Sequence, residues 1–139
     1  MKIDLSGKVA LVTASTAGIG FAIAKGLAES GAEIILNGRS EQSVNAAIAR
    51  LQNEVSGAKA RPAIADLSDA DGAAQLLRAV NGVDILVNNA GIYGPQGFYA
   101  TDDATWDNYW QTNVMSGVRL SRGLLPAMVS KGWGRVVFI

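Results

Sequence analysis

The stretch Lys8-Val-Ala-Leu-Val-Thr-Ala-Ser-Thr-Ala-Gly-Ile-Gly20 joins a short apolar run to a turn that ends in two glycines. The run is rich in β-branched residues and predicts a buried strand. Beyond the turn the period changes, because Ile19, Ile23 and Leu27 recur every four residues. Gly31 then supplies a C-terminal stop, so the pattern predicts a helix of about a dozen residues.

The same alternation of strand and helix continues along the chain. Further strands are expected at residues 33–37, 60–65, 83–87 and 135–139, helices at about 44–55, 68–80 and 102–130, and a loop at 88–101. Strands that alternate with helices need crossover connections, which produce a mostly parallel sheet with both faces covered. The sequence therefore predicts a doubly wound α/β fold, with all 139 residues in one domain.

Composition excludes several classes of function. Twelve basic residues balance twelve acidic ones, so neither nucleic acid nor a membrane surface is an expected partner. The chain has no cysteine and no histidine, which excludes disulfides, Ser-His or Cys-His triads and typical zinc sites, and no metal is expected. The lack of disulfides is compatible with a cytoplasmic location, which we expect. No apolar run approaches the roughly 20 residues of a transmembrane helix.

The last predicted strand, at residues 136–139, is apolar and has no helix after it to cover one side. An uncovered edge of this kind invites pairing with another chain. We expect either that more chain follows or that another polypeptide covers the strand. A fragment truncated after its fifth strand is favoured over a small domain that happens to end there.

The first strand-to-helix turn has the composition of a phosphate-binding loop. Glycines at positions 18 and 20 let a backbone approach a pyrophosphate closely, and the free amides around Ile19 at the helix start hold anionic oxygens. The alternative is that Gly18 and Gly20 serve only a tight turn.

This spacing resembles the TGxxxGxG motif of the short-chain dehydrogenase/reductase family, with Ala14 where the first glycine usually lies. A methyl group disfavours positive φ, so we expect Ala14 to form the turn with negative φ. The segment Asn88-Asn-Ala-Gly91 resembles the NNAG segment of the same family, which places Asn89, Ala90 and Gly91 beside the cofactor.

The resemblance implies a Rossmann-type sheet in the order 3-2-1-4-5, with three α/β/α layers. In that order the loops after the first and fourth strands flank the ligand crevice. An Asx turn leaving a strand is the simpler alternative for the Asn-Gly loop.

The ends of the second and third strands bear on the cofactor. In an NAD enzyme an acid usually follows the second strand, whereas an arginine there pairs with the 2′-phosphate of NADP. Gly38 and Arg39 therefore favour NADP over NAD, with Ser15, Thr16 and Ser40 as neutral donors. The alternative is that Arg39 is only a solvated charge.

By the resemblance, Asp66 contacts the adenine amino group and Leu67 lies beside the ring. Asp66 could instead, or in addition, cap the helix that starts near Ser68.

In the long helix, Asn113 resembles the asparagine of the family's Asn-Ser-Tyr-Lys catalytic group. The family asparagine holds a water of the proton relay through its backbone, so we expect a break in helix geometry near Asn113. A polar residue on a solvated face is the alternative.

The resemblance implies an oxidoreductase that transfers hydride between NADP(H) and a small carbonyl or alcohol substrate, and a homo-oligomer, dimer or tetramer, built through the 102–130 helix. The family's tyrosine and lysine are missing, because no Tyr-x-x-x-Lys occurs. Tyr93, Tyr99 and Tyr109 are followed at that spacing by Gly97, Asp103 and Asn113. We expect these residues alone to be nearly inactive.

Two other functions fit the same fold. A protein that senses dinucleotides without turnover would use the same cleft. A methyltransferase would share the glycine-rich turn, but it usually needs an acid after the second strand, where Gly38 and Arg39 stand.

Overall fold

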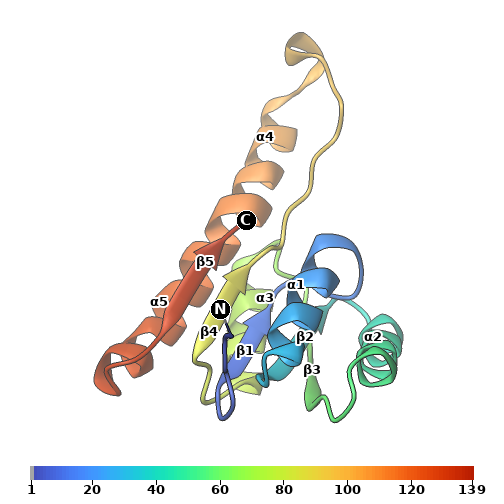
Figure 1. Cartoon of the computed structure of the whole chain (residues 1–139). Helices are drawn as coiled ribbons and strands as arrows, with labels where there is room; N and C mark the ends of the chain where they lie inside the picture. Colours follow the sequence, from blue (N-terminus) through green and yellow to red (C-terminus); the bar gives the residue numbers. More distant parts are fainter. Residues whose placement is uncertain (1) are drawn as a thin grey trace.

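Five parallel strands form the centre of the computed structural model, which describes residues 2–139 (Figure 1). They are β1 (Val9–Val12), β2 (Glu33–Gly38), β3 (Ala60–Ile64), β4 (Ile85–Asn88) and β5 (Arg135–Phe138). Their order in the sheet is β3-β2-β1-β4-β5, and each neighbouring pair is parallel. The expected doubly wound topology is confirmed.

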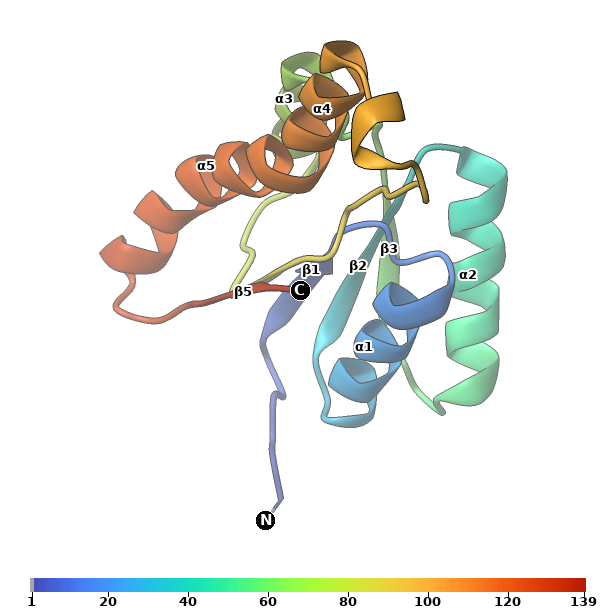
Figure 2. The ribbon, with the colours of Figure 1, turned by 90° about the horizontal axis from the view of Figure 1, so that it is seen from above.

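Helices cover both faces of this sheet. They are α1 (Gly18–Glu29), α2 (Glu41–Glu54), α3 (Ala70–Ala79), α4 (Asp103–Tyr109) and α5 (Ser116–Ser130), with a 3₁₀ turn, η1 (Phe98–Ala100), and a π-helical segment, η2 (Trp110–Met115). Seen from above, α1 and α2 lie on one side of the strands and α3, α4 and α5 on the other (Figure 2). This arrangement gives the three expected α/β/α layers.

Alternation along the strands divides the core into two clusters. In β1, Ala10 and Val12 face α1 and α2, whereas Leu11 faces α3 and α5, and all three are fully buried. Both faces of a parallel sheet are covered at its centre, so the central strands β1 and β4 are largely apolar. This is why the strand segments could be recognised from the sequence.

Several element boundaries differ from expectation by one to three residues, and the clearest differences concern β4 and the long helix. β4 begins at Ile85, two residues later than expected, and the buried Asp84 before it accepts a hydrogen bond from the Val9 amide at 2.8 Å. The helix expected at 102–130 is not one regular helix, because η2 separates α4 from α5. Asn113 lies inside η2, so the predicted break is confirmed.

The sheet order places the turn after β1 and the loop after β4 beside each other. The order of strands reverses between β1 and β4, and ligands of such sheets bind at the carboxyl ends of the strands next to that reversal. None of the helices within residues 2–139 is long and apolar enough to cross a membrane.

Candidate functional site

The turn between β1 and α1 has two residues in the left-handed region. Gly18 has a φ of 57°, which glycine adopts without strain, and Ala14 has a φ of 48°. The expectation of a negative φ at Ala14 was therefore wrong. The reason is tertiary, because the Ala14 amide donates a hydrogen bond to Asn37 Oδ1 at 3.0 Å and its carbonyl accepts one from Asn89 Nδ2 at 3.1 Å.

The start of α1 presents unfilled backbone donors. Ala17 is the N-cap, and no side chain caps the helix, so the first amides lack the side-chain acceptor that often satisfies such a terminus. No atom lies within 4 Å of the Cβ position of Gly18, and the Ile19 side chain is 66% exposed. The first turn of α1 therefore faces open space in which an anionic group fits.

Gly20 is required for a different reason. A Cβ there would collide with the Ala14 carbonyl oxygen and would lie 2.5 Å from Asn89 Nδ2. The helix thus packs directly on the turn and on the loop after β4. This contact brings the two predicted motifs together.

Thr13 joins the same two loops and was not assigned a role from the sequence. Its buried Oγ1 accepts hydrogen bonds from the amides of Asn89 at 2.9 Å and Ala90 at 2.8 Å, while Asn89 Nδ2 also donates to the Thr13 carbonyl. The only available signal was a polar residue directly after a buried strand. The predicted convergence of the Gly18 turn and the Asn89 loop is confirmed in geometry.

The hydroxyl of Ser15 is engaged in hydrogen bonds with neighbouring backbone groups. It donates to the Val12 carbonyl at 2.7 Å and accepts from the Asn37 amide at 3.0 Å, and the residue has no exposed surface. A hydroxyl has one proton to donate, so Ser15 Oγ has none left for a cofactor phosphate. The expected donor role of its side chain is therefore not supported.

At the end of β2 there is no room for an acidic side chain. A Cβ at Gly38 would lie 2.7 Å from Thr16 Cγ2 and 2.9 Å from Val44 Cγ2. Arg39 follows, is exposed, and takes part in none of the four ion pairs within residues 2–139. Ser40 caps α2 by accepting from the Ser43 amide at 3.2 Å. The end of β2 therefore carries the guanidinium of Arg39 and has no space for an acidic side chain at position 38.

Asp66, after β3, lies near enough to Arg39 to respond to its charge. Its Oδ1 accepts a hydrogen bond from the Ser68 amide at 3.0 Å. This bond, a second one to the Ser68 side chain and the charge of Arg39 hold the pKa of Asp66 below its ordinary value. The carboxylate is thus ionised at neutral pH and exposed to a ligand.

The alternative role for Asp66 as a helix cap was wrong. α3 begins at Ala70, and its N-cap is Asp69, whose side chain accepts from the Gly72 amide at 2.8 Å. The Leu67 side chain also departs from expectation. It is 5% exposed and packs in the core with α3, so only the backbone of Leu67 can lie beside a bound ring.

Asn113 is connected to the loop after β4. Its Oδ1 accepts from the Ile92 amide at 2.7 Å and its Nδ2 donates to the Ile92 carbonyl at 2.8 Å. A Cβ on Gly91 would lie 3.4 Å from Asn113 Oδ1. The side chain of Asn113 therefore anchors the loop, and any ligand role falls to its backbone within the π-helical segment, where hydrogen bonding departs from the regular α pattern.

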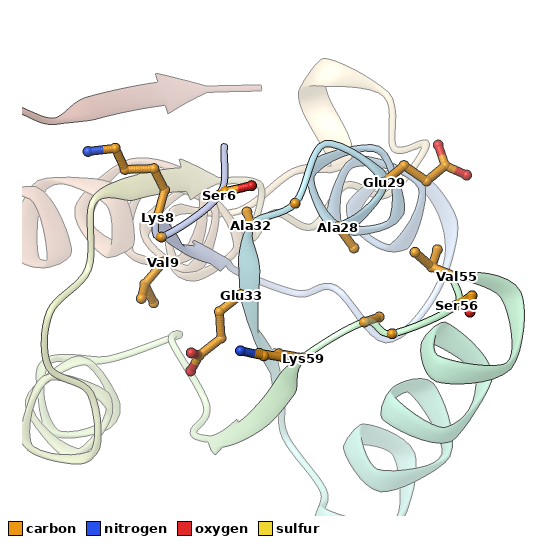
Figure 3. Close-up of a pocket in the computed structure, with 14 residues that line it drawn as sticks. Ser6, Lys8, Val9, Ala28, Glu29, Ala32, Glu33, Val55, Ser56 and Lys59 are labelled. Atoms are coloured by element: carbon orange, nitrogen blue, oxygen red, sulfur yellow. The ribbon is translucent and has the colours of Figure 1, made fainter. Parts of the chain in front are cut away.

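A separate pocket lies at the opposite end of the sheet (Figure 3). It has a volume of about 480 Å³ and is lined where β1 and β2 begin, with Lys8, Glu33 and Lys59 among its residues. None of the predicted site residues lines it. Within residues 2–139 there is also no cluster of three or more acidic side chains that could hold a metal ion.

Comparison with known sequences gives consistent matches. A family model described as short chain dehydrogenase matches residues 8–139. An uncharacterized oxidoreductase, YvaG, of Bacillus subtilis is 48% identical over all of this chain and 53% of that relative. Gluconate 5-dehydrogenase of Gluconobacter oxydans is 38% identical over 98% of this chain and 54% of that enzyme. The chain thus spans about half the length of the curated relatives it matches.

Solved structures agree. L-Sorbose reductase from Gluconobacter frateurii, complexed with NADPH and L-sorbose, superposes with a TM-score of 0.92 at 37% identity, covering 99% of this chain and 54% of that one. A 3-oxoacyl (acyl-carrier-protein) reductase from Agrobacterium tumefaciens with bound NADP gives a TM-score of 0.89 at 38% identity, covering 97% and 53%.

Proposed function

Because the chain belongs to the short-chain dehydrogenase family, we propose that residues 1–139 bind NADP(H) for an oxidoreductase that acts on a small carbonyl or alcohol substrate. The observation that carries this proposal is the close approach of the Gly18 turn to the Asn89 loop at the carboxyl ends of β1 and β4. Uncapped amides at the start of α1 face open space there, and Thr13 holds the two loops together. These are the features that a pyrophosphate requires.

The choice of NADP over NAD rests on the end of β2. Thr16 and Val44 leave no room for an acid at Gly38, and Arg39 has no ion-pair partner among the described residues. A guanidinium suits a 2′-phosphate, whereas a carboxylate suits ribose hydroxyls. Complexes of similar proteins with NADPH or NADP support the same choice.

Each site residue has a stated task in this proposal. The amides from Gly18 to Gly20 hold the pyrophosphate, and Arg39, with the hydroxyls of Thr16 and Ser40, holds the 2′-phosphate. Asp66 accepts from the adenine amino group, with the Leu67 backbone beside the ring. Residues 89–91 line the crevice, and the Asn113 backbone orients a water. When bound, the cofactor donates or accepts the hydride.

The proton that accompanies the hydride needs a further group. No Tyr-x-x-x-Lys lies in these residues, so we propose that chain outside them supplies it. We also propose self-association through α4 and α5. Trp106 in α4 and Trp110 at the start of η2 are 53% and 55% exposed and thus available for contact.

Calorimetric titration of the complete protein with NADPH and NADH tests the cofactor assignment. We expect NADPH to bind more tightly, and Arg39→Ala to remove most of that preference. A charge-assisted hydrogen bond contributes about 1.5–3 kcal/mol, which corresponds to a preference of roughly 10- to 150-fold. Arg78→Ala, which removes an exposed arginine from α3, is the matched control and should leave the preference unchanged.

Equal affinities for NADPH and NADH before mutation would refute the assignment of NADP. If neither dinucleotide binds, the proposed function itself is wrong.

A further inference from the structure

Ala14, in the turn between β1 and α1, has a backbone conformation that is unusual for a residue other than glycine. Its φ of 48° lies in the left-handed region, where a Cβ crowds the following carbonyl oxygen. It is the one residue other than glycine with positive φ within residues 2–139. Some specific interaction must therefore hold Ala14 there.

Two asparagine side chains form hydrogen bonds with the backbone of Ala14. Asn37 Oδ1 accepts from its amide at 3.0 Å, and Asn89 Nδ2 donates to its carbonyl at 3.1 Å. Asn89 lies at the partly exposed rim of the crevice, whereas Asn37 is 2% exposed. Of the two, Asn37 is the more firmly held.

The orientation of the Asn37 amide is determined by its partners. Its Nδ2 donates to the carbonyls of Ala63 at 3.0 Å and Ala65 at 3.3 Å, while its Oδ1 accepts from Ala14. Reversing the amide would place a donor against a donor and an acceptor against two acceptors. Its backbone also exchanges hydrogen bonds with Ser15, at 3.0 Å to Oγ and 2.9 Å from the amide.

We propose that Asn37 is a positioning residue, which holds Ala14 in the left-handed conformation and so shapes the turn that receives the cofactor pyrophosphate. This inference rests on the proposed NADP(H) site. The same amide is bound to the carbonyl of Ala65, directly before Asp66, and it lies two residues before Arg39. One buried side chain thus sets the relative positions of the turn, the 2′-phosphate contact and the adenine contact.

A double-mutant cycle on the complete protein tests the proposal. Without Asn37 Oδ1 the Ala14 conformation loses its support, so Asn37→Ala should weaken NADPH binding roughly tenfold, the equivalent of a lost hydrogen bond. Glycine adopts positive φ freely, so Ala14→Gly should recover at least about threefold in the Asn37→Ala protein but change wild-type affinity less than about threefold. If Asn37→Ala weakened binding only because a core contact was lost, Ala14→Gly would have the same effect in the Asn37→Ala protein as in wild type.

Ser15→Ala is the matched control. It removes hydrogen bonds from the same turn, to Val12 and Asn37, but leaves the bond between Asn37 Oδ1 and the Ala14 amide. In this background Ala14→Gly should have no larger effect than in wild type. An equal effect of Ala14→Gly in all three backgrounds would overturn the proposal.

A second variant covers the case in which Asn37→Ala fails to fold. Asn37→Asp keeps an acceptor for the Ala14 amide and loses the donor to Ala63 and Ala65, so Ala14→Gly should not rescue it beyond its wild-type effect; a larger rescue contradicts the proposal. Thermal unfolding without cofactor separates this inference from the proposed function. There, Ala14→Gly should raise the Tm by roughly 2–4 °C more in the Asn37→Ala protein than in wild type, even if NADPH does not bind.

Discussion

Gly38 lies at the end of β2, where the neighbouring side chains leave no space for a Cβ. An added methyl group would lie 2.7 Å from Thr16 Cγ2 and 2.9 Å from Val44 Cγ2, and Val44 is fully buried, so it cannot move aside. We predict that Gly38→Ala lowers the free energy of unfolding of the complete protein by about 1–3 kcal/mol, the usual cost of overpacking a core. Urea denaturation measures this change.

Gly26→Ala is the matched substitution with the opposite expected sign. Gly26 lies within α1, and no atom approaches its Cβ position within 4 Å. Alanine has the higher helix propensity, so this variant should gain up to about 1 kcal/mol. Equal stability changes for the two variants would contradict the steric account of Gly38.

At the scale of single residues, the sequence predicted the role of a residue correctly where that role follows from the residue's own chemistry. Gly18 has the conformation that its type suggests, and Arg39 is the free cation expected after β2. Ser15 and Leu67 could not be assigned in the same way, because burial by distant elements determines what their side chains can reach. Asn37 was recognisable only as a polar residue in an apolar strand.

Asp84 connects elements that are far apart in the sequence. Its carboxylate accepts from the Val9 amide at the start of β1 and pairs with Lys131 after α5. Burial acts to raise the pKa of Asp84, but the hydrogen bonds from Lys131 and the Val9 amide outweigh it, so the pKa lies below its ordinary value. The ionised form therefore stabilises the folded protein.

The sign of the pH dependence follows from this lowered pKa. The stabilisation is complete above the ordinary value of 3.8 and is lost as the pH falls through the lower pKa of the folded state. We predict that Asp84→Asn lowers the free energy of unfolding by about 1–3 kcal/mol at pH 7, the usual contribution of hydrogen bonds to a charged group. Denaturation at several pH values should show this difference shrinking below pH 3.8.

Lys131→Met removes the other partner and should be similarly destabilising at pH 7. A deficit of Asp84→Asn that stays constant down to strongly acidic pH would show that packing, not charge, is responsible.

At the scale of elements, periodicity predicted nearly every helix and strand, and the break near Asn113 came from the family resemblance. The separation into α4, η2 and α5 is not visible in the apolar period alone. It coincides with the hydrogen bonds of Asn113 to Ile92, 21 residues earlier in the chain. The local pattern of apolar residues cannot predict a contact between residues so far apart in the chain.

For the molecule as a whole, β5 is the exposed apolar edge of the sheet. It pairs with β4 on one side, and the side chains of Val137, Phe138 and Ile139 are 42%, 59% and 66% exposed. Exposed apolar edge strands pair with other chains. We predict that residues 1–139 expressed alone self-associate, and that Val137→Lys reduces this association, as measured by light scattering over a range of concentrations.

Ile3→Lys is the control, because Ile3 is 57% exposed but lies before β1, away from this edge. If Ile3→Lys and Val137→Lys reduce association equally, general surface polarity is the cause and the edge is not.

The sequence by itself determined the layers, the class of sheet and the two loops that meet at the crevice. The class of sheet depends on apolar period and the turns on glycine spacing, which are local properties of the chain, and the family resemblance supplied the strand order that brings the two loops together. Only the tertiary structure decided the conformation of Ala14, the occupation of Ser15 and the burial of Leu67. Each of these depends on a packing or hydrogen-bond partner that folding brings close, such as Asn37, which is 23 residues from Ala14.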